Sequence, residues 1–554
     1  MFRTSDPSET RLRSIQQTLT NDATFGRWQI SINLIPWIWG LTLATTLAGR
    51  MALADFNLND DHWIVFWLGE TGHFPSSKIW HELLATEVGT LGSGGRFRPV
   101  YWLHLELETW LFGDRPGFYY ALRILYFGLF LGATCRIAAR CIGLMPALVL
   151  VTLAAGMGFW SDLWAFSLGP TEQPAFLGIA LFMIACDAIV RRFVSGEHIP
   201  AWALPVASLG MAIAAGSKEN FVFLLAILGA VAMSIAVTRC FRIASAILAL
   251  LPLAVPALVL YALALYAGNT VDFYGVDNSV AHRLAEMLNW HEMLGRPLFV
   301  PFALAATLLA VPLAWLGYRR SSLPRPQRGR ATLVFTGFIG LLAAYMLWEL
   351  FFYNGRLPSG IRFDFPILLL PASIVLGFAA FTRYVLVPGG GLRWRSVQVA
   401  FIALSVFCLA FFQVPFSLPR DVKAAVDRTT AVRHDFNVMR MTTSTHPDWP
   451  IVLEPNRPFM DYNVVATFHE WARFFGISNP IMLRVEATSE DLSKLEQLLL
   501  GHMQQWETAG VNGSLQPLPD PAALEKLNGH CFAVEFWRPI VSPCLRLDFV
   551  RTRY

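Results

Sequence analysis

The chain has 554 residues, of which 55% are apolar and 13% aromatic, whereas only 15% are charged. Its mean hydropathy of +0.47 lies far outside the usual range of soluble enzymes, so the composition indicates a polytopic membrane protein. The formal net charge of +4 is small for this length, and the absence of a basic tract with interleaved aromatics gives no support to nucleic-acid binding.

The N-terminal residues 1–29 are too polar for a signal peptide, which places an apolar core directly after a short basic start. We therefore predict a cytoplasmic tail. After it come eleven apolar segments, each near the ~20 residues that cross a bilayer. These segments are 30–48, 117–135, 143–159, 174–190, 200–216, 220–238, 243–266, 297–317, 331–352, 365–382 and 397–416.

Basic residues give this array of segments an orientation. With the N-terminus inside, Lys and Arg concentrate in the inner connections, for example at Arg191, Arg192 and between Arg319 and Arg330, as the positive-inside rule requires. Because successive connections alternate between the two sides of the membrane, this orientation places the loop 49–116 and residues 417–554 outside. The sequence thus predicts a multi-pass protein of a bacterial-type cytoplasmic (inner) membrane, with a transmembrane domain over 30–416.

The outer loop 49–116 carries two segments with amphipathic character, at about 61–69 and 99–113. In the second segment Trp102, Leu105 and Trp110 alternate with charged residues, a pattern typical of a helix that lies in the membrane interface. A further outer segment, 268–297, is polar with helical spacing. We expect these segments to cover the outer face of the transmembrane domain.

The composition changes after Pro419. Short apolar runs alternate with helix-like segments up to Tyr554, which predicts a small α/β domain over 417–554. Cys531 and Cys544 both lie in this domain. If the domain is extracytoplasmic, a disulfide between them is expected to be stable there.

Paired acids follow the first apolar segment. Asp60 or Asp61, just outside the membrane, can act as a base that deprotonates an acceptor hydroxyl. Asp55, nearer the membrane, is a weaker candidate for the same site. The alternative is structural, because Asn59 or Asp60 can simply cap the helix that follows.

Two arginines in the sequence GGRFRP, Arg96 and Arg98, are candidates for binding a phosphate. Arginine offers a bidentate fork to phosphate oxygens, and the neighbouring glycines let the backbone approach closely. Arg362, with Asp364 to orient it, can complete this phosphate site. The alternatives are interfacial anchors for Arg96 and Arg98, and a helix-end ion pair for Arg362 and Asp364.

Three more ionisable residues stand at the outer ends of predicted spans: Glu172, Lys218 and Glu219. Ionisable groups at such positions are functional candidates. Lys218 can reach a phosphate, and Glu172 an acceptor or an arginine. Because neighbours in a helix do not face each other, Lys218 and Glu219 are expected to have different partners. The alternative is that all three are turn residues exposed to water.

Cofactor binding has little support in the sequence. His104 and Glu108 are spaced i, i+4, but no recognisable set of metal ligands surrounds them. A divalent cation held by an acid pair is the form that a metal site would take. The chain contains no phosphate-binding loop or dinucleotide fingerprint. We therefore expect no cofactor.

The order of these parts resembles the GT-C superfamily of polytopic glycosyltransferases, which includes protein O-mannosyltransferases and the aminoarabinose transferase of lipid A. One span is followed by an outer loop that starts with NDDHW, then by GRFRP, interfacial helices, many spans and an outer C-terminal domain. The resemblance implies a polyprenyl-phosphate-linked sugar donor, a catalytic acid at Asp60 or Asp61, and donor-phosphate contacts from Arg96, Arg98 and Arg362. The segment SKEN, with Lys218 and Glu219, resembles a Lys-Glu motif of several members.

The resulting hypothesis is an inverting glycosyltransferase that transfers a sugar to a hydroxyl of a cell-envelope glycan, lipid or protein. The chain lacks a WWDYG-type motif, which disfavours transfer of a whole oligosaccharide to asparagine. Two other classes stay open. A transporter or flippase of an envelope precursor would have polar or broken spans that meet near the midplane, and a non-catalytic scaffold would tolerate replacement of the loop acids and arginines.

Overall fold

The computed structural model of this chain describes more than half of its residues. These are 26–58, 61–92, 96–156, 159–164, 167–238, 243–266, 281, 284–285, 299–321, 323–352, 376–382, 385, 417–454, 462–483, 515–517, 527, 529–535 and 544–547. The expected cytoplasmic tail up to residue 25, most of 268–297, most of the span 365–382 and the whole span 397–416 lie outside them.

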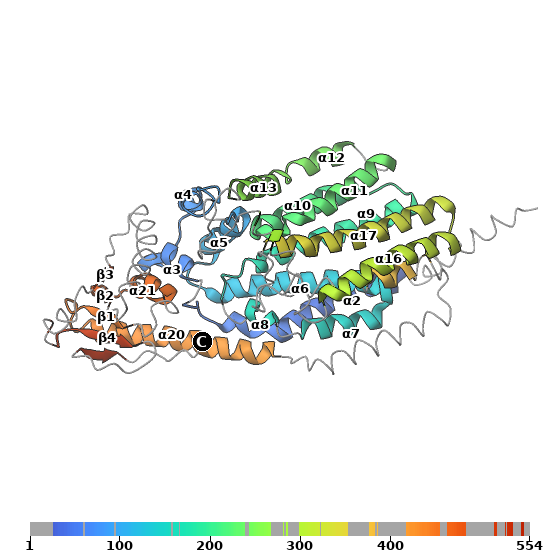
Figure 1. The fold of residues 1–554 in the computed structure, drawn as a ribbon. Helices are drawn as coiled ribbons and strands as arrows, with labels where there is room; N and C mark the ends of the chain where they lie inside the picture. The colour runs from blue at the N-terminus through green and yellow to red at the C-terminus, as the bar shows by residue number, and fades with distance from the viewer. Residues whose placement is uncertain are drawn as a thin grey trace, which may run out of the picture.

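A frame of helices forms the larger part of the molecule (Figure 1). Its helices are α2 (Gly26–Ala48), α6 (Pro116–Ile142), α7 (Leu144–Ala155), α9 (Glu172–Ser195), α10 (Ala203–Ser217), α11 (Leu224–Thr238), α12 (Ile243–Leu250), α13 (Ala254–Tyr266), α16 (Phe299–Arg320) and α17 (Arg325–Phe352). They are rich in Leu, Ala, Ile and Phe, which is typical of helices surrounded by apolar material.

Glycines let neighbouring helices of the frame approach closely. A Cβ atom built on Gly40 of α2 would collide with the backbone of Gly132 and Gly128 in α6. Likewise, a Cβ on Gly178 of α9 would lie 2.5 Å from the carbonyl oxygen of Gly210 in α10. Small residues at such crossings are the usual device by which helices pack in membranes.

Two described helices, α6 and α9, are long and apolar enough to cross a membrane. The pair α12 and α13 would make a third span if it is taken as one helix bent by 43°. The expectation of eleven spans is therefore supported only in part. Several expected spans are shorter helices here: α7 ends after 12 residues and α10 after 15, below the ~20 residues of a perpendicular span.

Short helices of the predicted outer loop gather at one end of the frame (Figure 1). They are η2 (Gly49–Leu53), α3 (His62–Leu68), η3 (Gly69–Thr71), η4 (Ser76–Lys78), α4 (Ile79–Ala85) and α5 (Pro99–Phe112). Helices α3 and α5 coincide with the two predicted amphipathic segments. Pro99 stands in the first turn of α5, where its missing N–H and fixed φ suit a helix start.

The C-terminal part contains a five-stranded parallel sheet in the order β3-β2-β1-β4-β5. Its strands are β1 (Ile451–Glu454), β2 (Ile481–Leu483), β3 (Leu515–Pro517), β4 (Phe532–Glu535) and β5 (Leu545–Leu547). In the central strand, Ile451 is in register with Ile481 on one side and Phe532 on the other. This is the strand order of doubly wound α/β proteins, in line with the small α/β domain expected there.

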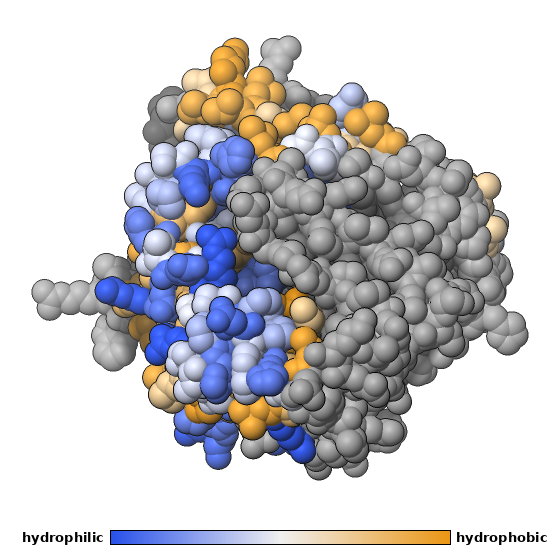
Figure 2. All heavy atoms as spheres, turned by 90° about the vertical axis from the view of Figure 1, so that its left-hand side faces the viewer, coloured by the Kyte–Doolittle hydropathy of each residue, from blue (hydrophilic) through white to orange (hydrophobic). Residues whose placement is uncertain are grey.

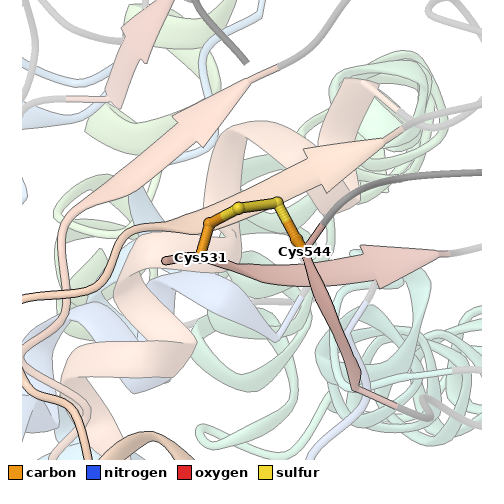
Figure 3. The surroundings of a disulfide bond; sticks show 2 residues. All are labelled: Cys531 and Cys544. Carbon is orange, nitrogen blue, oxygen red and sulfur yellow. A yellow bond between two sulfur atoms is a disulfide. The ribbon is translucent and has the colours of Figure 1, made fainter. Parts of the chain in front are cut away.

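A disulfide joins Cys531 and Cys544, the residues directly before β4 and β5 (Figure 3). Their Cα atoms are 4.7 Å apart, as expected for neighbouring positions on paired strands. Both cysteines pack with Val452 and Ala533 on one face of the sheet. The bond thus ties the amino ends of the last two strands together.

The helix α20 (Leu418–Thr443) connects the frame to the sheet. Its first half packs on α2, η2 and α8 (Phe159–Trp164). In the second half of α20, Phe436 stacks on Phe475, with ring centroids 4.9 Å apart. Phe475 directly follows α21 (Tyr462–Phe474), and α21 packs on α3. Seen from this end, described hydrophilic residues gather on the left side of the view, with apolar ones mainly above and below them (Figure 2).

Candidate functional site

Asp61 is completely buried, and both of its carboxylate oxygens bind backbone amides. Oδ1 accepts a hydrogen bond from the N–H of Leu168 at 2.7 Å, and Oδ2 from the N–H of Asn57 at 2.8 Å. Asp61 occupies the N-cap position of α3, yet its side chain does not cap that helix. It instead fastens the first outer loop to the segment that precedes α9. Its neighbour Asp60 lies outside the described residues.

Arg98 and Glu219 form a partly buried ion pair across 121 residues of sequence. Arg98 Nε lies 2.8 Å from Glu219 Oε1, which also accepts a hydrogen bond from the N–H of Phe97 at 3.2 Å. The Glu219 side chain is 2% exposed. Glu219 therefore holds the segment that begins α5 against the start of η5 (Glu219–Phe223).

Lys218 forms a second ion pair, and this one is fully buried: its Nζ atom binds Oε1 of Glu172 at the start of α9. Lys218 has an extended backbone (φ −148°, ψ 129°) between α10 and η5, so its side chain and that of Glu219 leave the chain toward different elements. The expectation that these neighbours have different partners is confirmed. The alternative of water-exposed turn residues is wrong, because Glu172, Lys218 and Glu219 are 0%, 5% and 1% exposed.

These two ion pairs, together with Glu87 and Arg96, make up what we call the charge cluster. Glu87 accepts a hydrogen bond from Trp102 Nε1 at 3.3 Å. Burial raises the pKa of the Glu87 carboxyl, and Arg98 and Arg96 oppose this effect. Burial by itself would lower the pKa of Arg98, but Glu219, Glu87 and Glu172 outweigh it and raise that pKa. The cluster thus contains three acidic side chains and three cationic ones, at the place where the outer loop meets α9 and η5.

Asp55 belongs to a different group, which we call the Arg433 clamp. Arg433 of α20 places Nη1 2.6 Å from Asp55 Oδ1 and Nη2 3.3 Å from Asp114 Oδ2. The N–H of Asp55 also donates to Thr429 Oγ1 at 3.1 Å. Burial raises the pKa of Asp114, while Arg433 opposes the shift. Sequence reasoning missed Arg433 and Asp114. Arg433 lies in a polar helix 378 residues after Asp55, and nothing in the sequence of that helix marks it as the partner of Asp55.

Glu108 of α5 sits in a buried polar group with Arg123 of α6. Glu108 Oε2 accepts a hydrogen bond from Arg123 Nη2 and lies 3.2 Å from His104 Nδ1. The other ring nitrogen of His104 is 2.9 Å from the hydroxyl of Tyr126. The His104 and Glu108 pair thus bonds to protein groups. Within the described ranges no cluster of three or more His, Cys, Asp or Glu is placed to hold a metal.

Glu106, also on α5, is completely buried, and neither of its carboxylate oxygens has a hydrogen-bond partner among the described residues. Burial and the nearby Glu82 raise its pKa to about 9. Its carboxyl group is therefore protonated at neutral pH.

The structure therefore brings five of the predicted site residues into one place: Arg96, Arg98, Glu172, Lys218 and Glu219 belong to the charge cluster. Asp61 stands apart as a link between two loops, and Asp55 is bound in the Arg433 clamp. The predicted Asp60, Arg362 and Asp364 lie outside the described residues. Neither the family models nor the curated proteins compared with this chain give a match to it.

Proposed function

We propose that this protein is a membrane glycosyltransferase that moves a sugar from a polyprenyl-phosphate-linked donor to a hydroxyl group of a cell-envelope acceptor. The observation that carries the proposal is the charge cluster. It gathers cations and acids from the outer loop, α9 and η5 in a largely buried site at the end of the helical frame. A phosphate leaving group needs such fixed cations.

In this mechanism the donor phosphate binds beside Arg96, Arg98 and Lys218, with Arg362 added from the outer connection after α17. The ion pairs with Glu219 and Glu172 hold Arg98 and Lys218 in position before the donor arrives. Cations that are already oriented stabilise the charge on the departing phosphate without having to reorganise. The phosphate leaves with its charge developed, so a separate general acid is not required.

The acceptor hydroxyl is deprotonated by a carboxylate as its oxygen attacks the anomeric carbon from the face opposite the phosphate, which inverts the configuration. Both oxygens of Asp61 are engaged by the N–H groups of Leu168 and Asn57. We therefore assign the role of base to Asp60 first, and a positioning role to Asp61.

The proposed enzyme crosses the membrane in the eleven segments given by the sequence, with its N-terminus in the cytoplasm. The outer loop and the sheet then lie on the extracytoplasmic side, where a disulfide between Cys531 and Cys544 is chemically stable. Support comes from the two described helices long enough to span, and from the gathering of the loop helices and the sheet at one end of the frame (Figure 1).

Donor binding tests the proposal directly. The full chain, extracted in mild detergent, is mixed with a short polyprenyl-phosphate sugar and examined by native mass spectrometry. We expect a bound donor in the wild type, and at least tenfold weaker binding in Arg98→Ala and Arg362→Ala. Arg115→Ala, an exposed cation of the same loop, is the matched control. Equal binding by the wild type and both site variants would refute the donor site.

A transporter or flippase is the second candidate, and one feature favours it. The α12 and α13 pair bends by 43° around Leu251–Leu253, and transporters commonly place broken helices at their binding sites. A reconstituted protein that moves labelled lipid across liposomes, without forming any glycosylated product, would support this class over the enzyme.

A further inference from the structure

Three arginines between α16 and α17 take no part in the proposed reaction. Arg319 and Arg320 end α16, and Arg325 begins α17; we call these three residues the arginine turn. All three are exposed, and within the described part of the chain no carboxylate pairs with them. The sequence contains no Asp or Glu between Glu292 and Glu349. The arginine turn is therefore a cationic surface that its own segment does not neutralise.

Arg328 of α17 holds the two helix ends together. Its Nη1 atom donates a hydrogen bond to the carbonyl oxygen of Tyr318 at 2.8 Å, and its Nη2 atom donates one to that of Leu323 at 2.9 Å. The carbonyl groups in the last turn of a helix have no partner inside it, and a basic side chain often binds them. Because Tyr318 directly precedes Arg319, these bonds keep the end of α16 beside the first turn of α17.

The arginine turn lies at the end of the helical frame away from the sheet (Figure 1). Tyr345, 20 residues after Arg325, packs on Phe223 of η5 with ring centroids 5.2 Å apart. η5 begins at Glu219, a member of the charge cluster. At 1.5 Å per residue, α17 separates Arg325 from Tyr345 by about 30 Å. This is about the thickness of the hydrocarbon core of a bilayer, as expected for the two ends of the predicted span 331–352.

An apolar stripe on α16 leads to the arginine turn. It consists of Leu308, Val311, Trp315 and Tyr318, which are 76%, 67%, 55% and 47% exposed. Steps of three and four residues place these side chains on one face of the helix. The guanidinium of Arg319 lies 4.1 Å from the centroid of the Trp315 ring, within the range of a cation–π contact. Exposed Trp and Tyr beside cations at a helix end are typical of the boundary between membrane and water.

The end of α9 adjoins this part of the frame. Arg330 Nη1 lies 3.4 Å from the carbonyl oxygen of Phe193, and its guanidinium is 5.9 Å from the centroid of that ring. The two acids near this end of α9, Asp187 and Glu197, are already bound to arginines of α6 and α9. They therefore do not compensate the positive charge of the arginine turn.

We propose that the arginine turn binds the headgroup of an anionic phospholipid, whose acyl chain lies along the apolar stripe of α16. Arginine pairs well with phosphate oxygens, and the amino end of α17 adds the partial positive charge of a helix N-terminus. Charge and apolar surface are thus arranged in the order in which a phospholipid presents its phosphate and its chain. The site goes beyond the proposed sugar transfer, because it lies at the other end of the frame from the charge cluster.

Dioleoylphosphatidylglycerol is the probe, added to the full chain in mild detergent and counted by native mass spectrometry. Dioleoylphosphatidylcholine, which has the same chains and no net charge, is the reference lipid. We expect the wild type to bind the anionic lipid at least tenfold more tightly than the neutral one. The triple variant Arg319→Gln, Arg320→Gln and Arg325→Gln should lose this preference, because each basic side chain near an anionic headgroup adds to the attraction. Retention of the preference by this variant would overturn the inference.

A second triple variant controls for the loss of net charge. It carries Lys78→Gln, Lys423→Gln and Arg440→Gln, which replace exposed cations of η4 and α20. We expect it to keep the preference for the anionic lipid. Because all the replaced side chains are exposed, both triple variants should unfold at the wild-type temperature. An equal loss of preference in the two would show that net charge attracts the lipid, and would overturn the site.

The acyl chain and the phosphate are tested separately. The double variant Val311→Ser and Trp315→Ser removes apolar surface from the stripe, and we expect it to bind the anionic lipid about tenfold more weakly. Unchanged binding would overturn the placement of the chain on α16. Excess inorganic phosphate should leave the lipid bound to the wild type. Displacement of the lipid would indicate a site for a soluble anion and would overturn the assignment to a phospholipid.

The same measurements separate this site from the proposed donor site. The arginine-turn variant should bind the polyprenyl-phosphate sugar like the wild type, and Arg98→Ala should keep its preference for the anionic phospholipid. Loss of donor binding in Arg98→Ala alone supports two distinct sites. Loss of donor binding in the arginine-turn variant would instead place the donor phosphate at the arginine turn, and would overturn the assignment to a membrane phospholipid.

Discussion

The carboxylate of Asp61 accepts a hydrogen bond from the backbone N–H of Leu168, which lies 107 residues further along the chain. Its other oxygen binds the N–H of Asn57. Replacement by asparagine would turn one of these acceptors into an NH2 group that faces a backbone donor. We expect Asp61→Asn to lower the free energy of unfolding by about 1–3 kcal/mol, the cost of a buried unsatisfied donor, as measured by thermal unfolding in detergent.

Asp60→Asn is the matched variant at the neighbouring position. We expect it to unfold at the wild-type temperature and to lose sugar transfer, because it removes the proposed base and none of the bonds of Asp61. If Asp60→Asn keeps full transfer while Asp61→Asn, once folded, has none, the role of base passes to Asp61. Full transfer in both variants would remove the carboxylate base from the mechanism.

The partly buried pair of Arg98 and Glu219 predicts a non-additive mutant cycle. Arg98→Ala leaves a buried carboxylate without its cation, and Glu219→Gln leaves a partly buried guanidinium without its anion. We expect each to cost about 1.5–3 kcal/mol, the contribution of a hydrogen bond to a charged group. The double variant should be more stable than the sum of the two costs implies, because no uncompensated charge remains. Thermal unfolding of the four proteins measures this coupling, and additive costs would contradict the ion pair.

Glu106 predicts how stability depends on pH. Its pKa rises from an ordinary 4.5 to about 9 in the folded protein, so folding takes up a proton between these values. The contribution of Glu106 to stability is then fully present below pH 4.5 and is lost as the pH rises toward 9. We expect Glu106→Gln to remove this part of the slope, because glutamine has no proton to lose.

The control for this measurement is Glu70→Gln, which changes an exposed glutamate of the same loop. It should unfold with the same pH dependence as the wild type. A slope between pH 5 and pH 9 that Glu106→Gln leaves unaltered would show that Glu106 does not take up a proton on folding.

The disulfide between Cys531 and Cys544 spans 13 residues. The loss of a crosslink that closes a loop of about 15 residues costs about 3 kcal/mol in the chain-entropy treatment. We expect the double variant Cys531→Ala and Cys544→Ala to lose stability on this scale. Thiol counting under denaturing conditions should find two further reactive cysteines only after reduction, and an equal count before and after it would exclude the bond.

Local reasoning predicted well those features that depend on neighbours in sequence. The amphipathic spacing around Trp102 predicted α5, and the i, i+1 geometry predicted that Lys218 and Glu219 have different partners. Which partners they have is a tertiary property, because Arg98 and Glu219 are 121 residues apart. Arg433 gave no signal at all, since an arginine in a polar helix is ordinary.

Arg123 did carry a signal that the sequence interpretation did not use. It is a lone charge within the apolar segment 117–135, and ionisable residues in such segments are functional candidates by default. The eleven expected spans are supported only in part. Apolar composition does not mark where a helix ends, and α7 stops at Gly156 and α10 at the extended Lys218.

One hydrophobic core runs without interruption from the helical frame through α20 into the sheet, with Ala44, Phe127, Val422, Phe436 and Ile451 among its members. The expected domain boundary at residue 417 thus has no hinge where α20 lies on the frame. A shared, close-packed core resists movement of the sheet relative to the helical frame. We therefore expect the strands to keep one height and one direction relative to the ends of the helices.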